Sequence, residues 1–277
     1  MRHLDEFCKV NVVGSLAELS VETLDGYRAT RMIGAVTSTK ELQTLRQFCE
    51  FCVERNWLTE NVAKRLKPPR NAKPQPIEPY REAEVAAILA ACDAFGRTNY
   101  ERRRARAMVL LLRFTALRIS DVATLARDRV RDGCVLLHTQ KTGGLVLLPV
   151  PTEVLDALNA LPTPRGAPVA CPYFFWNGVT SRRSVIGIAE GTLASVFKKS
   201  GVSKGKTHRF RHTLATEILV KGGTEQDVAD VLGISPAIVR KHYAKWTPAR
   251  QRRILNLMKA VHSGTFLAQI DKEAVIQ

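Results

Sequence analysis

The stretch Thr207-His208-Arg209-Phe210-Arg211-His212 opens a predicted helix that runs from Arg211 to Lys221. Apolar residues follow at helical spacing and predict a face turned toward a core, namely Leu214, Ile218 and Leu219. The pair Gly222-Gly223 is expected to end the helix. A helical core gives no reason for a His-x-x-Arg pair at this point. His208 and Arg211 are therefore candidate functional residues.

Further helices, and two strands, are predicted on both sides of this stretch. The expected helices span residues 21–32 (started by Ser20 or Thr23), 40–55, 59–66, 82–92, 100–115, 120–125 (capped by Ser120), 152–161 and 191–200. Strands are expected at 134–138 and 145–150, joined by a glycine-containing hairpin at 139–144. A capping box of Thr224 and Asp227 predicts a helix ending at Gly233, and Ser235-Pro236 starts the next helix. The fold class is mainly α with a small β-sheet (α+β).

A proline-rich segment divides the chain. Five prolines stand between Leu66 and Pro79, and they exclude regular structure there. Lys67, Arg70 and Lys73 make the segment basic, as suits a strap along a duplex. We therefore expect a helical domain at 1–69, a linker at 70–79, a second domain at 80–263 and a tail at 264–277. The sequence leaves open whether the first domain is truncated at its N-terminus.

The charge balance favours a polyanionic partner. The chain has 277 residues, a formal net charge of +16 and a pI of about 9.9. Lys and Arg placed on phosphates release counterions, so nucleic acid leads over an evenly spread charge or an anionic membrane. The longest apolar run, Met108–Leu117, is short and contains Arg113, and the N-terminus is not a signal peptide. We expect a soluble, intracellular protein.

The six cysteines do not predict a metal site. Cys49 and Cys52 form a C-x-x-C, but no second Cys/His pair lies nearby to complete four zinc ligands. Their spacing repeats one apolar helical face, which favours core packing and reduced thiols. We expect neither a metal nor another cofactor.

Three more polar residues stand where packing does not require them. Arg118 follows an apolar helix, Lys141 lies at the hairpin tip, and Tyr243 ends an amphipathic run. Each alone is a weak signal. In the order Leu117-Arg118-Ile119-Ser120-Asp121, Lys141, His208-x-x-Arg211 and Tyr243 after Leu232-Gly233, they resemble the signature of the tyrosine recombinase (phage integrase) family.

The resemblance implies both architecture and chemistry. The helical domain would be a core-binding (SAM-like) domain, and the second an integrase-type catalytic domain. Arg118 and Arg211 would clamp the scissile phosphate, and Tyr243 would attack it to form a 3′-phosphotyrosyl link. His208 would assist proton removal or hold the phosphate, and Lys141 would protonate the leaving oxygen. Asp121 would orient Arg118, and neither metal nor ATP is required.

The resemblance also implies partners. These are double-stranded DNA with inverted half-sites, a homotetramer on that DNA, and accessory DNA-bending proteins. A cytoplasmic, nucleoid-associated enzyme of a prokaryote, phage or mobile element is expected. The tail 264–277 is hydrophobic for a free terminus and is predicted to dock onto a neighbouring protomer.

One position departs from the family pattern. Ile234 stands nine residues before Tyr243, where the family usually has His and sometimes Trp. Loss of that donor would cost about 2–4 kcal/mol of transition-state stabilisation. His212 and His242 are alternative donors. His242 is adjacent to Tyr243, and adjacent residues of a helix point in different directions, so we do not expect His242 to replace the lost donor. The departure leaves open that the protein is a DNA-binding relic without cutting activity. A second alternative is a type IB topoisomerase, which uses the same chemistry.

Overall fold

The computed structural model describes residues 2–70, 77–139, 143–243, 255–256 and 258. The chain forms two compact units, Met1–Pro76 and Ile77–Gln277. Within the described ranges, no helix combines the length and the apolar character that a membrane crossing needs.

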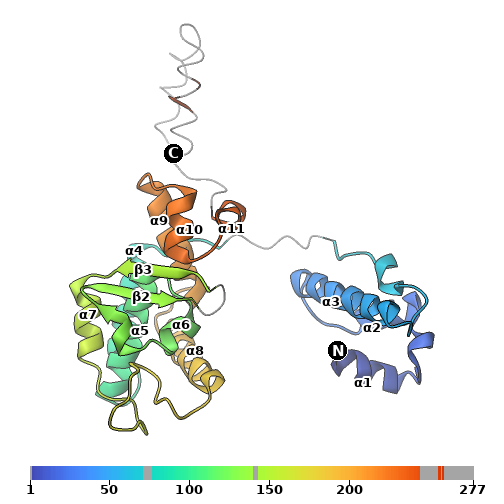
Figure 1. Cartoon of the computed structure of the whole chain (residues 1–277), viewed down its shortest axis with the longest axis horizontal. Helices are drawn as coiled ribbons and strands as arrows, with labels where there is room; N and C mark the ends of the chain where they lie inside the picture. The colour runs from blue at the N-terminus through green and yellow to red at the C-terminus, as the bar shows by residue number, and fades with distance from the viewer. Residues whose placement is uncertain (1, 71–76, 140–142, 244–254, 257, 259–277) are drawn as a thin grey trace. The chain divides into compact units, whose positions relative to one another are not determined.

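The N-terminal unit is helical. It contains α1 (Arg2–Val10), α2 (Val21–Ala29) and α3 (Ala35–Glu54), with 3-10 turns at Leu16–Glu18 and Val62–Arg65 (Figure 1). Ser20 is the residue that caps α2, because its side chain accepts from the Thr23 N–H. The helix predicted at 59–66 is only a four-residue 3-10 turn, and α1 was not predicted.

The two cysteines of the C-x-x-C lie in the core of this unit. Cys49 and Cys52 have no exposed surface, and both are free thiols. Burial raises the pKa of Cys49, which keeps the thiol protonated. The prediction that this pair packs into the core is confirmed. The surrounding core is formed by apolar side chains of α2, α3 and the last turn, including Leu24, Tyr27, Leu42, Leu45 and Leu66.

The C-terminal unit combines helices with one small sheet. Its elements are α4 (Glu82–Asp93), α5 (Asn99–Thr115), α6 (Ile119–Ala123), β1 (Val130–Arg131), β2 (Cys134–His138), β3 (Leu145–Pro149), α7 (Thr152–Asn159), α8 (Arg182–Lys199), α9 (Thr207–Val220), α10 (Glu225–Leu232) and α11 (Pro236–His242). The strands are antiparallel in the order β1-β2-β3, and Leu136 pairs with Leu147. The α+β class is confirmed.

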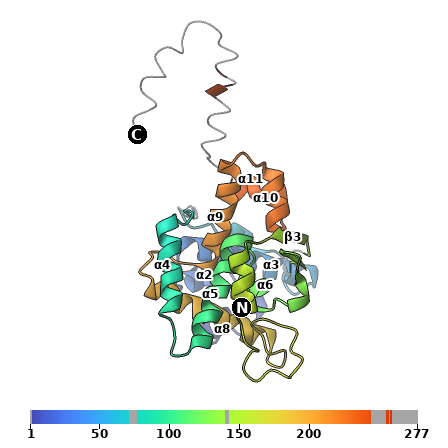
Figure 2. The same ribbon diagram turned by 90° about the vertical axis from the view of Figure 1, so that its left-hand side faces the viewer.

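Helix α5 is the centre of this unit. It packs against α4, α7, α8 and α9, and it lies among these helices in Figure 1. Its run from Met108 to Leu112 is at most 1% exposed. Helices α9, α10 and α11 lie together at one end of the unit (Figure 2). The C-terminal end of α5 leads directly into α6, so residues after Thr115 start from a rigid position.

Several helix starts differ from the prediction. Helix α3 begins at Ala35 instead of residue 40, and α9 begins at Thr207 instead of Arg211. Ser120 was expected to cap α6, but the cap is Arg118, whose carbonyl accepts from the Asp121 and Val122 N–H groups. Helix α8 begins at Arg182 instead of residue 191, because the Ser181 side chain caps it through the Ser184 N–H. Gly191, at which the predicted helix started, and Gly187 both lie inside α8. Buried Val185, Ala189 and Leu193 on its inner face offset their cost of about 1 kcal/mol each.

The turn signals near the C-terminus were correct. Thr224 and Asp227 form the predicted capping box of α10, and Pro236 is the first residue of α11. Gly233 ends α10 in the left-handed conformation with φ +58°. A Cβ on Gly233 would meet Thr139 Cγ2 and Val146 Cγ1 at 3.1 Å each. The end of α10 therefore lies directly beside the base of the β2–β3 hairpin.

Gly233→Ala is expected to lower the free energy of unfolding. A left-handed alanine costs about 1–2 kcal/mol, and the two close contacts add to that cost. Urea unfolding of the full chain measures the change. Gly187→Ala is the matched control: its Cβ would meet nothing within 4 Å in an exposed part of α8, so it should stabilise by about 0.5–1 kcal/mol. Equal changes in the two variants would contradict this account of Gly233.

Candidate active site

Arg211 holds together the ends of two helices. It lies in the second turn of α9 and is 3% exposed. Its Nη1 donates to the carbonyl of Ala116, just after α5, and its Nη2 donates to the carbonyl of Leu232 at 2.8 Å. Its Nε is buried and has no hydrogen-bond partner in the part of the chain that the structure describes. The guanidinium is thus fixed in place and still has a donor to offer.

Arg118 supplies a second guanidinium near the first. It is the N-cap of α6, two residues after the left-handed Ala116 that ends α5. Its side chain is half-buried, and the buried Nη1 finds no acceptor among the described residues. Buried donors without partners are rare in folded proteins because they lose their bonds to water. Two such donors on neighbouring arginines are what an anion-binding site requires.

The electrostatic influences on Arg211 show which groups converge on it. Burial lowers the pKa of the guanidinium, and the charge of Arg118 lowers it further. The phenol of Tyr243 raises this pKa through its charge and a side-chain hydrogen bond, and Asp121 also raises it. Asp121 is 3% exposed, on α6. The structure therefore brings Arg118, Arg211 and Tyr243 together, from three regions of the sequence.

Three aromatic rings line up beside these arginines. Tyr243 is half-buried at the C-terminal end of α11, where its N–H donates to the Val239 carbonyl at 2.8 Å. Its ring centroid lies 4.6 Å from that of His212, and His212 lies 5.2 Å from His208 at 75°. His208 is exposed, whereas His212 is 8% exposed. His212 is thus the ring that packs against the candidate nucleophile.

The sequence offered only a weak signal for this role of His212. The residue was considered as a substitute hydrogen-bond donor, but not as a packing partner of Tyr243. It lies four residues after His208, hence one turn further along the same face of α9. The side chain of the other alternative, His242, lies outside the described residues.

Lys141 also lies outside the described residues, but the stem of its hairpin does not. The Thr139 N–H donates to the Gly144 carbonyl at 2.9 Å, and the Gly143 N–H donates to the Thr139 carbonyl at 2.8 Å. Thr139 is buried beside Gly233. Gly233 directly follows Leu232, whose carbonyl accepts from Arg211. The hairpin that carries Lys141 therefore starts next to the arginine site.

Ile234 fills space and offers no side-chain donor. It is half-buried and packs, as Tyr243 does, against a cluster that includes Ala116, Leu232 and Val239. Its backbone N–H donates to the Ala229 carbonyl at 3.0 Å. The isoleucine thus supports the segment that leads to Tyr243.

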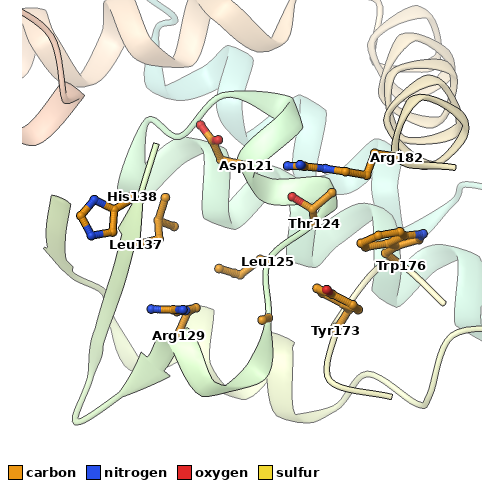
Figure 3. Close-up of a pocket in the computed structure, with 10 residues that line it drawn as sticks. Asp121, Thr124, Leu125, Arg129, Leu137, His138, Tyr173, Trp176 and Arg182 are labelled. Carbon is orange, nitrogen blue, oxygen red and sulfur yellow. The ribbon is translucent and has the colours of Figure 1, made fainter. Parts of the chain in front are cut away.

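A basic pocket of about 500 Å³ adjoins the site. Figure 3 shows Asp121 and Thr124 on one side of it, with His138, Arg129 and Arg182 around it and the rings of Tyr173 and Trp176 at one end. Arg129, His138 and Arg182 are exposed. Two arginines at the edge of a hollow suit a polyanion. Sequence reasoning missed this pocket because it depends on the early start of α8 at Arg182.

Comparison with known proteins shows which family the chain resembles. The phage integrase family matches residues 80–250. The chain is 29% identical over 205 residues to tyrosine recombinase XerC of Chlamydia muridarum, covering 71% of this chain and 62% of the relative. It is 25% identical over 230 residues to tyrosine recombinase XerD of Caulobacter vibrioides, covering 79% and 74%. The alignment with XerC thus spans less than two thirds of that relative's length.

Solved structures show the same fold. A lambda integrase (75–356) dimer bound to a COC' core site has a TM-score of 0.63 at 17% identity, covering 87% of this chain and 86% of that one. A lambda integrase tetramer bound to a Holliday junction has a TM-score of 0.61 at 15% identity, covering 88% and 78%. At these identities the likeness concerns the fold alone. Because the family match covers more than half of its length, this chain belongs to the phage integrase family.

Proposed function

We propose that this protein is a tyrosine recombinase that cuts and rejoins DNA at specific sites through a 3′-phosphotyrosyl intermediate. The observation that carries the proposal is the convergence of Arg118, Arg211 and Tyr243, with an unpartnered buried donor on each arginine. XerC and XerD, to which the chain is similar, are named tyrosine recombinases. Their name matches the chemistry that this set of side chains favours.

The two arginines would stabilise the transition state. Negative charge grows on the non-bridging phosphate oxygens as the nucleophile approaches, and fixed guanidinium donors lower the energy of that charge. Arg211 is held by two backbone carbonyls, so little reorganisation is needed when the phosphate arrives. Asp121, whose charge acts on Arg211, would help to orient Arg118.

Tyr243 would form the covalent link. Its phenolic oxygen attacks phosphorus, the bond from phosphorus to the 5′ oxygen breaks, and the 3′ phosphate becomes attached to the tyrosine. The phenolic proton passes to His208, and Lys141 gives a proton to the leaving 5′ oxygen. A second 5′ hydroxyl then attacks the phosphotyrosine and reverses these transfers. The energy of the broken bond is kept in the link, so rejoining uses neither ATP nor a metal.

The proposal extends to assembly. The solved structures that share the fold include a dimer on a core site and a tetramer on a Holliday junction. We infer double-stranded DNA with inverted half-sites as the substrate and a homotetramer as the active form, with DNA-bending proteins as accessory partners. The N-terminal unit would serve as the core-binding domain, in the cytoplasm at the nucleoid. Tail 264–277 lies outside the described residues, so its docking onto a neighbour stays a prediction.

Covalent trapping tests the function. Duplexes that the protein binds are first selected from random DNA, and the cleavage position is then nicked so that a short leaving strand diffuses away. Wild-type protein is expected to accumulate a covalent protein–DNA adduct on a denaturing gel. Tyr243→Phe should form none while it binds the same DNA with the same affinity, because only the attacking oxygen is lost.

The alternatives give different results in this experiment. A DNA-binding relic would form no adduct with either protein. A type IB topoisomerase would relax supercoiled plasmid that lacks the selected site. An adduct that persists in Tyr243→Phe would show that another residue is the nucleophile.

A further inference from the structure

A second cavity of about 340 Å³ lies toward the N-terminal end of α5, and Trp176 lines both this cavity and the basic pocket. We call it the Arg104 cavity. Its walls include Phe95, Tyr100, Arg104, Arg165, Phe175 and Trp176. Arg104 precedes the last residue of α5 by eleven positions, which is roughly 16 Å along a helix axis. The cavity is therefore well removed from Arg118, which follows the opposite end of α5.

Arg104 differs from the other buried arginines. It is 9% exposed, and burial lowers the pKa of its guanidinium. Arg209, at 8%, donates to three backbone carbonyls and pairs with Glu84, while Arg211 donates to two carbonyls. None of the residues that the structure describes accepts a hydrogen bond from Arg104 or forms an ion pair with it. Most of the Arg104 side chain is shielded from water, and an anion in the cavity would replace the solvent contacts that burial removes.

Other groups on the wall also favour an anion. The Arg165 guanidinium lies over the Tyr100 ring, 5.6 Å from its centroid. The Asn177 side chain uses its oxygen to accept the Val179 and Thr180 N–H groups, both at 3.0 Å, which fixes the amide at the wall of the cavity. Glu101 is the acidic residue on the wall, and its Oε2 is engaged at the start of α5 by the N–H groups of Arg97 and Thr98. These backbone hydrogen bonds lower the pKa of Glu101, and the charge of Arg165 also lowers it. Two arginines and one carboxylate on this wall leave an excess of positive charge.

Aromatic side chains form a large part of the remaining wall, together with aliphatic residues such as Pro164, Val185 and Ile188. Phe95, Tyr100, Phe175 and Trp176 surround the charged groups. Trp176 is fixed by its Nε1, which donates to the Thr180 carbonyl at 2.9 Å. Flat rings held in place accept another flat ring by stacking, and the guanidinium of Arg165 already lies over one of them.

We propose that the Arg104 cavity binds a small organic anion that carries a planar ring. Its volume is at the lower end of the range of ligand pockets, about 300–1,000 Å³. Arg104 and Arg165 would hold the anionic group, and the aromatic walls would hold the ring. A nucleotide phosphate and an aromatic carboxylate share this chemistry. The site is independent of the proposed DNA cleavage, so either proposal can fail without the other.

The proposal predicts an unusual effect on stability. Met has nearly the length of Arg and no charge, so Arg104→Met removes the desolvated cation without opening a large gap. The unliganded variant should melt at a higher temperature than the wild type, because no protein bond is lost. An arginine with a structural role would show the reverse, a lower melting temperature.

Calorimetric titration and thermal melting of the full chain test the site with three probes. These are adenosine 5′-monophosphate, benzoate and inorganic phosphate. We expect saturable binding of the nucleotide or of benzoate, and the stronger of the two identifies the source of the anion. Phosphate alone should bind at least tenfold more weakly, because it has no ring. Arg104→Met should lower the affinity for the probe that binds by roughly 10- to 100-fold.

Arg103→Met is the matched control. Arg103 is the next residue of α5, is exposed, and donates to the Ala160 carbonyl at 3.3 Å. The Arg103→Met variant should bind the probes with the same affinity as the wild type. The proposal is overturned if no probe binds, if phosphate binds as tightly as the ringed anions, or if Arg104→Met leaves affinity unchanged. A lower melting temperature of unliganded Arg104→Met would likewise assign Arg104 a structural role.

Discussion

Arg211→Met should lower the rate of adduct formation by about 100- to 1,000-fold and also destabilise the fold. The rate falls because a fixed donor to the developing phosphate charge is lost. Stability falls because the Arg211 guanidinium bonds the carbonyls of Ala116 and Leu232, and each bond to a charged group contributes roughly 1.5–3 kcal/mol. Single-turnover cleavage of the nicked substrate and urea unfolding measure the two effects.

Arg118→Met separates the two effects. No described backbone carbonyl accepts from the side chain of Arg118, and its Nη1 is unpartnered. This variant should lose cleavage rate to a similar degree and keep its free energy of unfolding within about 1 kcal/mol of the wild type. If Arg118→Met unfolds as readily as Arg211→Met, Arg118 has a structural role that the proposal does not contain. If Arg211→Met cleaves at the wild-type rate, the phosphate site is elsewhere.

Ile234→His is expected to raise the single-turnover cleavage rate by about 10- to 100-fold. Ile234 lies between the end of α10 and α11, half-buried and packed on the same cluster as Tyr243. An imidazole there would add a donor that isoleucine lacks, and a well-placed donor contributes about 2.7–4 kcal/mol in comparable sites. A histidine without an evolved setting should gain part of that value.

Ile234→Phe is the control for this variant. It introduces a ring of similar breadth without a hydrogen-bond donor, so it reports the cost of repacking the cluster around Val239. The histidine variant should be the faster of the two at every pH at which both are folded. Equal rates would mean that position 234 does not reach the phosphate in this protein, and that the site works with the donors of Arg118 and Arg211.

The sequence predicted the parts of the fold that local chemistry specifies. Capping signals placed α10 and α11, because Thr224, Asp227 and Pro236 act on the backbone within one turn. Alternation placed β2 and β3 within one residue. The start of α8 was missed because the Ser181 cap was not recognised, and the tertiary packing of Val185, Ala189 and Leu193 keeps Gly187 and Gly191 helical.

The candidate site was predicted from residue order, whereas its geometry was not. Nothing in the spacing of His208 and His212 indicates that the second ring lies against Tyr243, because that contact depends on how α11 folds back toward α9. The Arg104 cavity is still further from prediction. A run of four arginines within Arg102–Arg106 reads as a solvated helix start, and only burial distinguishes Arg104 from its neighbours.

The carbonyl bonds of Arg211 have a consequence for dynamics. One side chain joins the last turn of α10 to the residue that ends α5, so these backbone ends should open and close as a single cooperative unit. Amide hydrogens near Gly233 would then exchange with solvent at rates correlated with those near Ala116, despite more than a hundred intervening positions. Transient fraying of that unit would switch off the chemistry before the rest of the protein unfolds.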